Sequence, residues 1–242
     1  MSCCIALFGD CTVAAGPMPA MAPDRHLAVR LRRAFPGQPF VIRNAAATGE
    51  TAGDALKPGR LERVFQGMPR LDVAFVRYGI NDRKRDGVPG CIENLRTLCL
   101  RIAQEYEGVT VIIETGIWVD YPAHYMYDRN PRLAPLYEAM RRFAAEAGYP
   151  VVDIFRKMEI ETAKGNWDMR LRGLPDPEHA ILDDSFDQFF GDDPAFFTNI
   201  HPNSRCRGLI ADWEVEKLKE LFGDRLPNVA QPVRERSEAE SE

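Results

Sequence analysis

Residues 3–12, CCIALFGDCT, decide the fold class of this chain. The stretch Cys3–Phe8 is apolar throughout and ends at Gly9-Asp10, a pair typical of turns. A short apolar run closed by a turn predicts a buried β-strand. Cys11 follows the turn instead of lying inside the apolar run. The segment therefore predicts a strand with a thiol just beyond its carboxyl end.

Strand patterns recur along the chain and alternate with helical ones. Four more strands are expected at Pro39–Asn44, Leu71–Tyr78, Val109–Glu114 and Pro150–Ile154. Helices are expected at Pro23–Phe35, Leu61–Gln66, Cys91–Tyr106, Arg132–Ala147 (with Pro135 in its first turn) and Asn203–Phe222. Such alternation predicts a three-layer α/β/α, flavodoxin-like fold with a five-stranded parallel sheet. Ligands bind such sheets at the carboxyl ends of the strands.

Composition and length suit a single globular domain. The chain has 242 residues, of which 45% are hydrophobic, and we place the domain at residues 1–224. Residues 164–197, rich in Asp, Pro and aromatic side chains, are expected to form an insertion or lid. Residues 225–242 are polar and acidic at the end, which predicts a disordered tail.

Charge and hydropathy indicate which partners to expect. The net charge of −5 argues against a nucleic-acid partner. No apolar run approaches the roughly 20 residues of a membrane helix, and the apolar start lacks a basic signal-peptide region. We therefore expect no membrane partner and a cytoplasmic location. Nothing in the sequence indicates the oligomeric state.

The cysteines show no metal-binding or disulfide pattern. The six are Cys3, Cys4, Cys11, Cys91, Cys99 and Cys206, without a CxxC pair or a zinc-type Cys/His spacing. No glycine-rich phosphate loop or cofactor fingerprint occurs. The sequence predicts reduced thiols, no metal and no cofactor.

Four short motifs follow predicted strands or precede the last helix. They are Gly9-Asp10-Cys11-Thr12, Asn44 with Gly49, Gly79-Ile80-Asn81-Asp82, and Asn199-Ile200-His201-Pro202. In order and spacing they resemble the motifs of the SGNH (GDSL-type) hydrolase family, over roughly Cys3 to Phe222. The resemblance implies an esterase-type hydrolase acting on a small acylated substrate, such as a sugar or lipid-like ester.

The resemblance also implies a role for each matching residue. Cys11 stands where the family has its nucleophilic Ser, and His201 where it has its general base. Gly49 and Asn81 stand where the family has a backbone and a side-chain N–H donor to the oxyanion, with the Cys11 backbone N–H as a third. Acyl transfer needs such a set: a nucleophile, a base, and donors aimed at the developing negative charge.

The chain departs from the family pattern at two positions. The nucleophile is a thiol, natural or engineered, which is more acidic than a hydroxyl and would form a thioester. The Asp that the family has three residues before its His is replaced by Thr198, which carries no charge. A Cys–His pair depends less on that carboxylate, because a thiol loses its proton more readily. Candidates to orient the imidazole are Thr198, Asn199 and Asp10.

Two groups of side chains are candidate substrate contacts. Arg77 and Arg83 flank the Gly79–Asp82 loop and would suit an anionic substrate; the alternative is a solvated basic loop. Trp118 and Tyr121 begin an aromatic loop that would form a platform for a sugar or acyl chain. The alternative for this loop is simple packing.

Three functions are compatible with these residues. The first is hydrolysis of an ester or thioester through an acyl-Cys11 intermediate. The second is acyl transfer or thiol-dependent amide formation on the same fold, because thioesters react well with amines and thiols. The third is a non-catalytic binding module, favoured by the missing Asp but opposed by the joint presence of Cys11, Gly49, Asn81 and His201.

Overall fold

A computed structural model of the chain describes residues 1–14, 22–118, 129–165 and 204–229. The strands are β1 (Cys3–Gly9), β2 (Phe40–Asn44), β3 (Val73–Arg77), β4 (Thr110–Glu114) and β5 (Val151–Val152). They pair in parallel in the order β2-β1-β3-β4-β5. The predicted five-stranded parallel sheet is confirmed.

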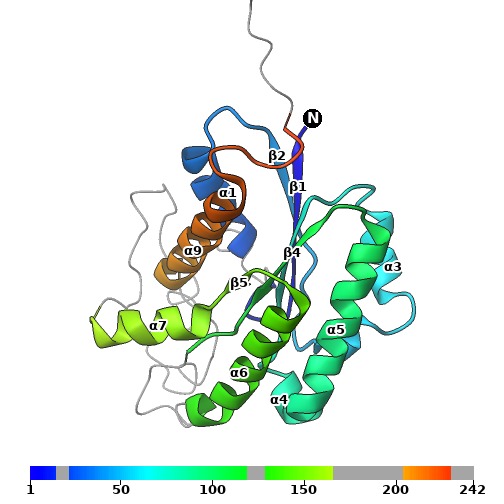
Figure 1. Cartoon of the computed structure of the whole chain (residues 1–242), viewed down its shortest axis with the longest axis vertical. Helices are drawn as coiled ribbons and strands as arrows, with labels where there is room; N and C mark the ends of the chain where they lie inside the picture. Colours follow the sequence, from blue (N-terminus) through cyan, green and yellow to red (C-terminus); the bar gives the residue numbers. More distant parts are fainter. Residues whose placement is uncertain (15–21, 119–128, 166–203, 230–242) are drawn as a thin grey trace, which may run out of the picture.

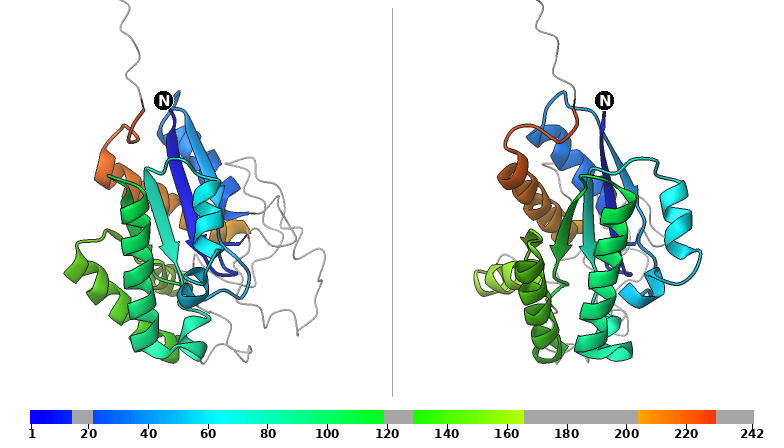
Figure 2. Two further views of the ribbon diagram at one scale, coloured as in Figure 1. Left: turned by 90° about the vertical axis from the view of Figure 1, so that its right-hand side faces the viewer. Right: turned by 45° about the vertical axis from the view of Figure 1, so that its right-hand side comes forward.

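Helices cover both faces of this sheet (Figures 1 and 2). α1 and α9 pack against each other on one face, whereas α3, α5 and α6 lie on the other. The three-layer α/β/α architecture is therefore confirmed. The described helices are α1 (Pro23–Ala34), α2 (Ala52–Ala55), α3 (Arg60–Gln66), α4 (Asp82–Arg85), α5 (Gly87–Glu105), α6 (Arg129–Ala147), α7 (Ile154–Ala163) and α9 (Ser204–Phe222).

The register of the central strands brings their carboxyl ends to one edge. Leu7 of β1 lies opposite Asn44 of β2, and Gly9 lies opposite Arg77 of β3. Every residue of β3 is buried, which agrees with the apolar run from Val73 to Val76 that precedes Arg77. The residues that follow β1, β2 and β3 are consequently neighbours at this edge.

Two predicted elements differ from the structure. The segment expected to end a strand at Ile154 instead begins α7, so β5 is only two residues long. The Asp153 side chain accepts the Arg156 backbone N–H and caps this helix. α6 begins at Arg129, so Pro135 lies inside it instead of in its first turn. Pro135 faces solvent, where water can satisfy the carbonyl that lacks its helical partner.

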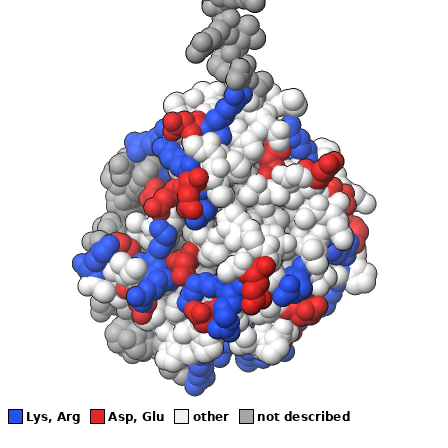
Figure 3. All heavy atoms as spheres, viewed as in Figure 1, with Lys and Arg blue, Asp and Glu red and all other residues white. Residues whose placement is uncertain are grey.

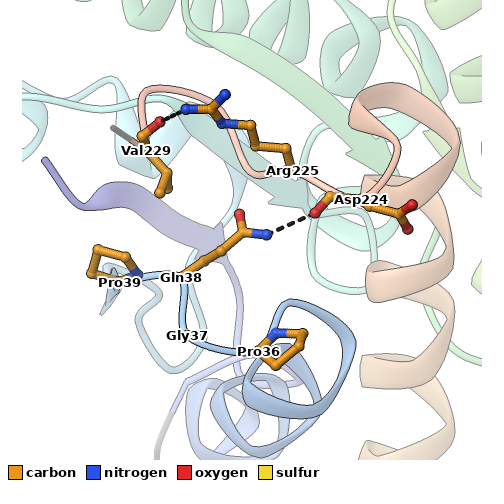
Figure 4. A pocket seen from close by; sticks show the side chains of 7 residues that line it. All are labelled: Pro36, Gly37, Gln38, Pro39, Asp224, Arg225 and Val229. Atoms are coloured by element: carbon orange, nitrogen blue, oxygen red, sulfur yellow. Dashed lines mark hydrogen bonds between the residues drawn. The ribbon is translucent and has the colours of Figure 1, made fainter. Parts of the chain in front are cut away.

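The folded domain extends past the predicted boundary at residue 224. Leu226 is buried, its backbone N–H donates to Gln38 Oε1 at 2.9 Å, and Gln38 Nε2 donates to the Asp224 carbonyl at 2.7 Å (Figure 4). Asn228 Nδ2 donates to Asp72 Oδ1 at 2.7 Å. These contacts hold residues 224–229 at the amino-terminal edge of the sheet, beside a pocket of about 530 Å³. The rest of the predicted tail, residues 230–242, lies outside the described residues.

The described surface mixes charges of both signs. Basic and acidic side chains are interspersed on the face shown in Figure 3. Among the described helices, none combines the length and the apolar character needed to cross a bilayer. Of the predicted insertion at residues 164–197, only Lys164 and Gly165 are among the described residues.

Candidate active site

Cys11 lies two residues beyond β1, at the carboxyl-terminal edge of the sheet. The turn that presents it is built by Asp10, whose Oδ1 accepts the backbone N–H of Thr12 at 2.9 Å and its hydroxyl at 2.8 Å. The Asp10 carbonyl accepts the N–H groups of Val13 and Ala14, both at 3.0 Å. Thr12 and Asp10 are buried, whereas Cys11 is half-buried. The turn therefore fixes the backbone and leaves the thiol accessible.

Three N–H groups beside the Cys11 sulfur lower the pKa of its thiol. They are the backbone N–H of Gly49, the side-chain amide of Asn81 and the backbone N–H of Cys11 itself. These groups come from the segments that follow β2, β3 and β1, the three strands whose ends meet at this edge. The structure thus brings together three of the four residues that the sequence analysis placed in one site.

Gly49 adopts a backbone conformation that favours glycine. Its φ is +76°, in the left-handed region. A Cβ built at this position would have no atom within 4 Å, so the requirement for glycine comes from the backbone and not from crowding. The space around Gly49 is open on the side where its side chain would be.

Asp82 joins the two loops that carry the donors. It is fully buried, and its Oδ1 accepts the Ala52 N–H at 2.8 Å while its Oδ2 accepts the Gly79 N–H at 3.0 Å. One carboxylate thus links the loop after β2 to the loop after β3. The link itself had no sequence signal, because its partners are backbone groups far apart in the chain.

The Cys11 thiol is held in its neutral form by its surroundings. Burial raises its pKa to about 11, and the negative charge of Asp10 acts in the same direction, while the three N–H donors lower it. Asp10 is itself buried, which raises its pKa to about 6, so it is ionised at neutral pH. A nucleophilic thiolate at this position therefore needs a base to take the proton.

Arg77 was expected as a substrate contact, and the structure corrects this expectation. Its side chain is buried, with Nε donating to Glu114 Oε2 at 3.0 Å and Nη2 to Glu214 Oε1 at 2.8 Å. Arg77 ends a strand whose residues are all buried, so its side chain points into the interior. Its guanidinium is occupied by the ion pairs and is not available to a substrate.

The two carboxyl groups beside Arg77 are both fully buried. Burial raises the pKa of both Glu114 and Glu214, and most strongly that of Glu214, where the charge of Glu114 adds to the effect. The buried group thus consists of one guanidinium and two carboxyl groups. It ties α9, the helix that follows the His201 motif, to the ends of β3 and β4.

The other predicted substrate contacts lie along the same edge. Arg83, on α4, is half-buried, and among the described residues its buried Nε has no hydrogen-bond partner. Trp118, after β4, packs on Phe155 of α7 with a ring distance of 5.0 Å. It lines a pocket of about 430 Å³ with Asn130 and Arg141 among others. β3 and β4 follow β1 in the sheet order, so Trp118 lies two strands away from the Cys11 loop.

Several predicted site residues fall outside the described residues. They are His201, Thr198, Asn199 and Tyr121. All six cysteines are described, and all are free thiols. In the described part of the chain, no group of three or more His, Cys, Asp or Glu side chains is arranged to hold a metal ion.

Comparison with known proteins identifies the family. The model of the GDSL-like lipase/acylhydrolase family matches residues 7–206, and the chain belongs to this family. It is accordingly a hydrolase of the GDSL-type esterase class. A search of curated protein sequences finds no match.

Solved structures with the same fold have low sequence identity. A lipase/acylhydrolase from Enterococcus faecalis is 21% identical, with a TM-score of 0.61 over 90% of this chain and 96% of the other. An α/β hydrolase from the metagenome of Lake Arreo is 17% identical, with a TM-score of 0.63 over 90% and 96%. A catalytic mutant of Axe2, an acetylxylan esterase from Geobacillus stearothermophilus, is 14% identical, with a TM-score of 0.62 over 90% and 95%. At these identities the similarity establishes the fold.

Proposed function

We propose that this GDSL-type esterase cleaves an ester or thioester of a small acylated substrate through an acyl-Cys11 intermediate. The observation that carries the proposal is that the loops after β1, β2 and β3 bring Cys11, Gly49 and Asn81 to one edge of the sheet, where their N–H groups lower the pKa of the Cys11 thiol. In a tetrahedral intermediate on Cys11, the oxyanion lies two bonds from that sulfur. Donors already directed there are suited to stabilise it.

The reaction proceeds in two halves. His201 takes the Cys11 proton as the sulfur attacks the acyl carbon, and the oxyanion is bound by the N–H groups of Cys11, Gly49 and Asn81. The intermediate collapses to a thioester, and the leaving alcohol or thiol takes the proton from His201. Water, deprotonated by His201, then attacks the thioester and releases the acid and the thiol. Thr198 or Asn199 orients the imidazole in place of the usual Asp.

The substrate is a small acylated molecule, a sugar or lipid-like ester. An acetylxylan esterase among the structures of the same fold fits the sugar alternative. Trp118 and Tyr121 are proposed to form an aromatic platform beside the site, and Arg83 to contact an anionic group. The half-buried Arg83 guanidinium, which has an unpartnered Nε among the described residues, supports that role.

Substitution of Cys11 tests the nucleophile. Cys11→Ala is expected to abolish turnover of p-nitrophenyl acetate. It is also expected to abolish formation of the acetylated enzyme, which mass spectrometry detects in the parent. Cys11→Ser is expected to retain weak activity, because the hydroxyl depends more on the missing Asp. Cys4→Ala is the matched control, since Cys4 is also half-buried but belongs to β1. Equal turnover by Cys11→Ala and the parent would refute the proposal.

The thiol also favours a second outcome, acyl transfer. A thioester on Cys11 reacts with amines and thiols as well as with water. Adding hydroxylamine or a simple thiol during turnover separates the two outcomes. Transfer product in excess of acid would make this chain an acyltransferase on the esterase fold.

A further inference from the structure

Glu50 is a buried carboxylate immediately beside one of the proposed oxyanion donors. It follows the exposed Gly49, yet it is only 7% exposed. Its Oε1 accepts Arg60 Nε at 2.7 Å, and its Oε2 accepts Arg60 Nη2 at 3.2 Å and the Tyr78 hydroxyl at 3.0 Å. A buried carboxylate is costly unless its oxygens are satisfied, and here both are. The side chain is therefore locked in one place.

The partners of Glu50 belong to the elements around the site. Arg60 begins α3 and also donates from Nη2 to the Ala45 carbonyl at 2.6 Å, just beyond β2. Tyr78 is buried and directly follows β3. Glu50 thereby connects the loop that contains Gly49 to the ends of two strands and to a helix. The position of the Gly49 N–H depends on these connections.

The backbone of Glu50 controls the second donor. Its carbonyl accepts Asn81 Nδ2 at 3.0 Å. A carbonyl oxygen accepts hydrogen bonds and cannot donate one, so the Asn81 side chain must turn its nitrogen, and not its oxygen, toward Glu50. One N–H of the amide is used by Glu50, and the side chain still donates to the Cys11 sulfur. Without the Glu50 carbonyl, the amide could rotate and present its oxygen to the site.

We propose that Glu50 is the positioning residue of the oxyanion hole. Its locked side chain holds the Gly49 N–H in place, and its carbonyl orients the Asn81 amide, so both donors face the Cys11 sulfur. Glu50 acts through these two residues and does not itself touch the substrate. The catalytic part of this inference rests on the proposed function, whereas the geometric part concerns the Cys11 sulfur alone.

The test uses two readouts on Glu50→Ala and Glu50→Gln. The first is the pH dependence of Cys11 alkylation by iodoacetamide, followed by peptide mapping. The donors lower the pKa of Cys11, so Glu50→Ala is expected to shift the alkylation profile to higher pH and to slow alkylation by about 10-fold at pH values below the apparent pKa of the parent thiol. The second is turnover of p-nitrophenyl acetate, where kcat is expected to fall by about 10²-fold with KM nearly unchanged. Glu50→Gln keeps one acceptor oxygen and is expected to lie between Glu50→Ala and the parent.

Asp72→Asn is the matched control. Asp72 is also a buried carboxylate with an Arg partner, since its Oδ1 accepts Arg70 Nε at 3.0 Å, but it lies at the opposite edge of the sheet. Asp72→Asn is expected to lower thermal stability without changing either readout. Tyr78→Phe removes only the hydrogen bond from the Tyr78 hydroxyl to Glu50. If Glu50→Ala does not fold, Tyr78→Phe takes its place as the test. It is expected to change both readouts in the same direction by a smaller factor.

The outcomes separate the inference from the proposed function. If folded Glu50→Ala and Tyr78→Phe match the parent in Cys11 alkylation, the inference is overturned. It is also overturned if Asp72→Asn slows alkylation as much as Glu50→Ala does, because the slower alkylation then reflects non-specific destabilisation of the fold. If the parent lacks esterase turnover but the alkylation shift appears, the proposed function fails and the positioning role stands.

Discussion

At the scale of single residues, the protonation of Cys11 is the central chemical question. The described surroundings of the thiol raise its pKa to about 11, through burial first and then the charge of Asp10. At neutral pH this leaves a neutral thiol with three donors directed at its sulfur. Such a site binds negative charge once it forms but does not create a thiolate unaided. The proposed base, His201, supplies that step.

Alkylation of Cys11 as a function of pH tests the pairing with His201. In His201→Ala the rate is expected to rise about tenfold for each pH unit until the pKa of about 11 is reached. In the parent, an imidazolium beside the sulfur favours the thiolate, so the apparent pKa is expected to lie well below 11. Iodoacetamide labelling of the Cys11 peptide measures both profiles.

Asp10→Asn provides the internal check on this experiment. It removes the second cause of the raised pKa while Asn Oδ1 still accepts the two bonds from Thr12. When Asp10→Asn is combined with His201→Ala, the apparent pKa of Cys11 should fall below that of His201→Ala alone. Superimposable profiles for the parent and His201→Ala would contradict the Cys–His pair.

At the scale of secondary-structure elements, α9 is held to the sheet by a buried ionic group. Arg77, Glu114 and Glu214 join the ends of β3 and β4 to this helix. Because burial raises the pKa of Glu214, its stabilising contribution is fully present below its unfolded pKa and is lost as pH rises through its folded pKa. The docking of α9 is therefore expected to weaken on the alkaline side.

Glu214→Gln tests the raised pKa of Glu214. Glutamine resembles protonated Glu214, since it can accept from Arg77 and donate to Glu114, so the free energy of unfolding at pH 5 is expected within about 1 kcal/mol of the parent. At higher pH the variant should become the more stable protein. Arg77→Met leaves the carboxyl groups without a cation and is expected to cost about 3–5 kcal/mol at neutral pH. Urea unfolding across pH measures all three proteins, and parallel curves for Glu214→Gln and the parent would rule out a raised pKa of Glu214.

The elements also show what the sequence could predict. The five strands and the main helices were recognised because each has its own apolar pattern. The start of α7 was missed because Pro150–Ile154 was interpreted as one strand, whereas Asp153 is the N-cap of the helix. Motif spacing was enough to predict that Cys11, Gly49 and Asn81 belong to one site. Glu50 and Asp82 were missed as links between loops, and Arg77 was misjudged, because their partners are distant in sequence.

At the scale of the whole molecule, the segment after α9 returns to the amino-terminal edge of the sheet and packs against residues that precede β2 and β3. Gln38 and Asp72 hold the segment after α9, and Leu226 fills the space between them and the core. This edge lies opposite the candidate active site. Its contribution is therefore to stability, and it is separable from catalysis.

Truncation measures that contribution. A chain ending at Val229 is expected to unfold at the same temperature as the parent, because residues 230–242 are predicted to be a disordered tail. A chain ending at Asp224 loses the buried Leu226 and is expected to be less stable by about 2–5 kcal/mol. Thermal unfolding by circular dichroism compares the three lengths. Equal midpoints for all three would show that residues 225–229 contribute nothing.

The contact between α1 and α9 has a consequence for synthesis of the chain. Arg30 of α1 donates to Asp212 of α9 at 2.7 Å, so the first and last helices complete the same layer. At about 5–20 residues per second, the ribosome adds α9 on the order of ten to thirty seconds after α1. During that interval α1, whose Leu27 and Leu31 are fully buried in the finished molecule, has no α9 to pack against. The nascent chain is therefore expected to expose apolar surface of α1 until α9 has been made, and this is the stage at which chaperones would bind it.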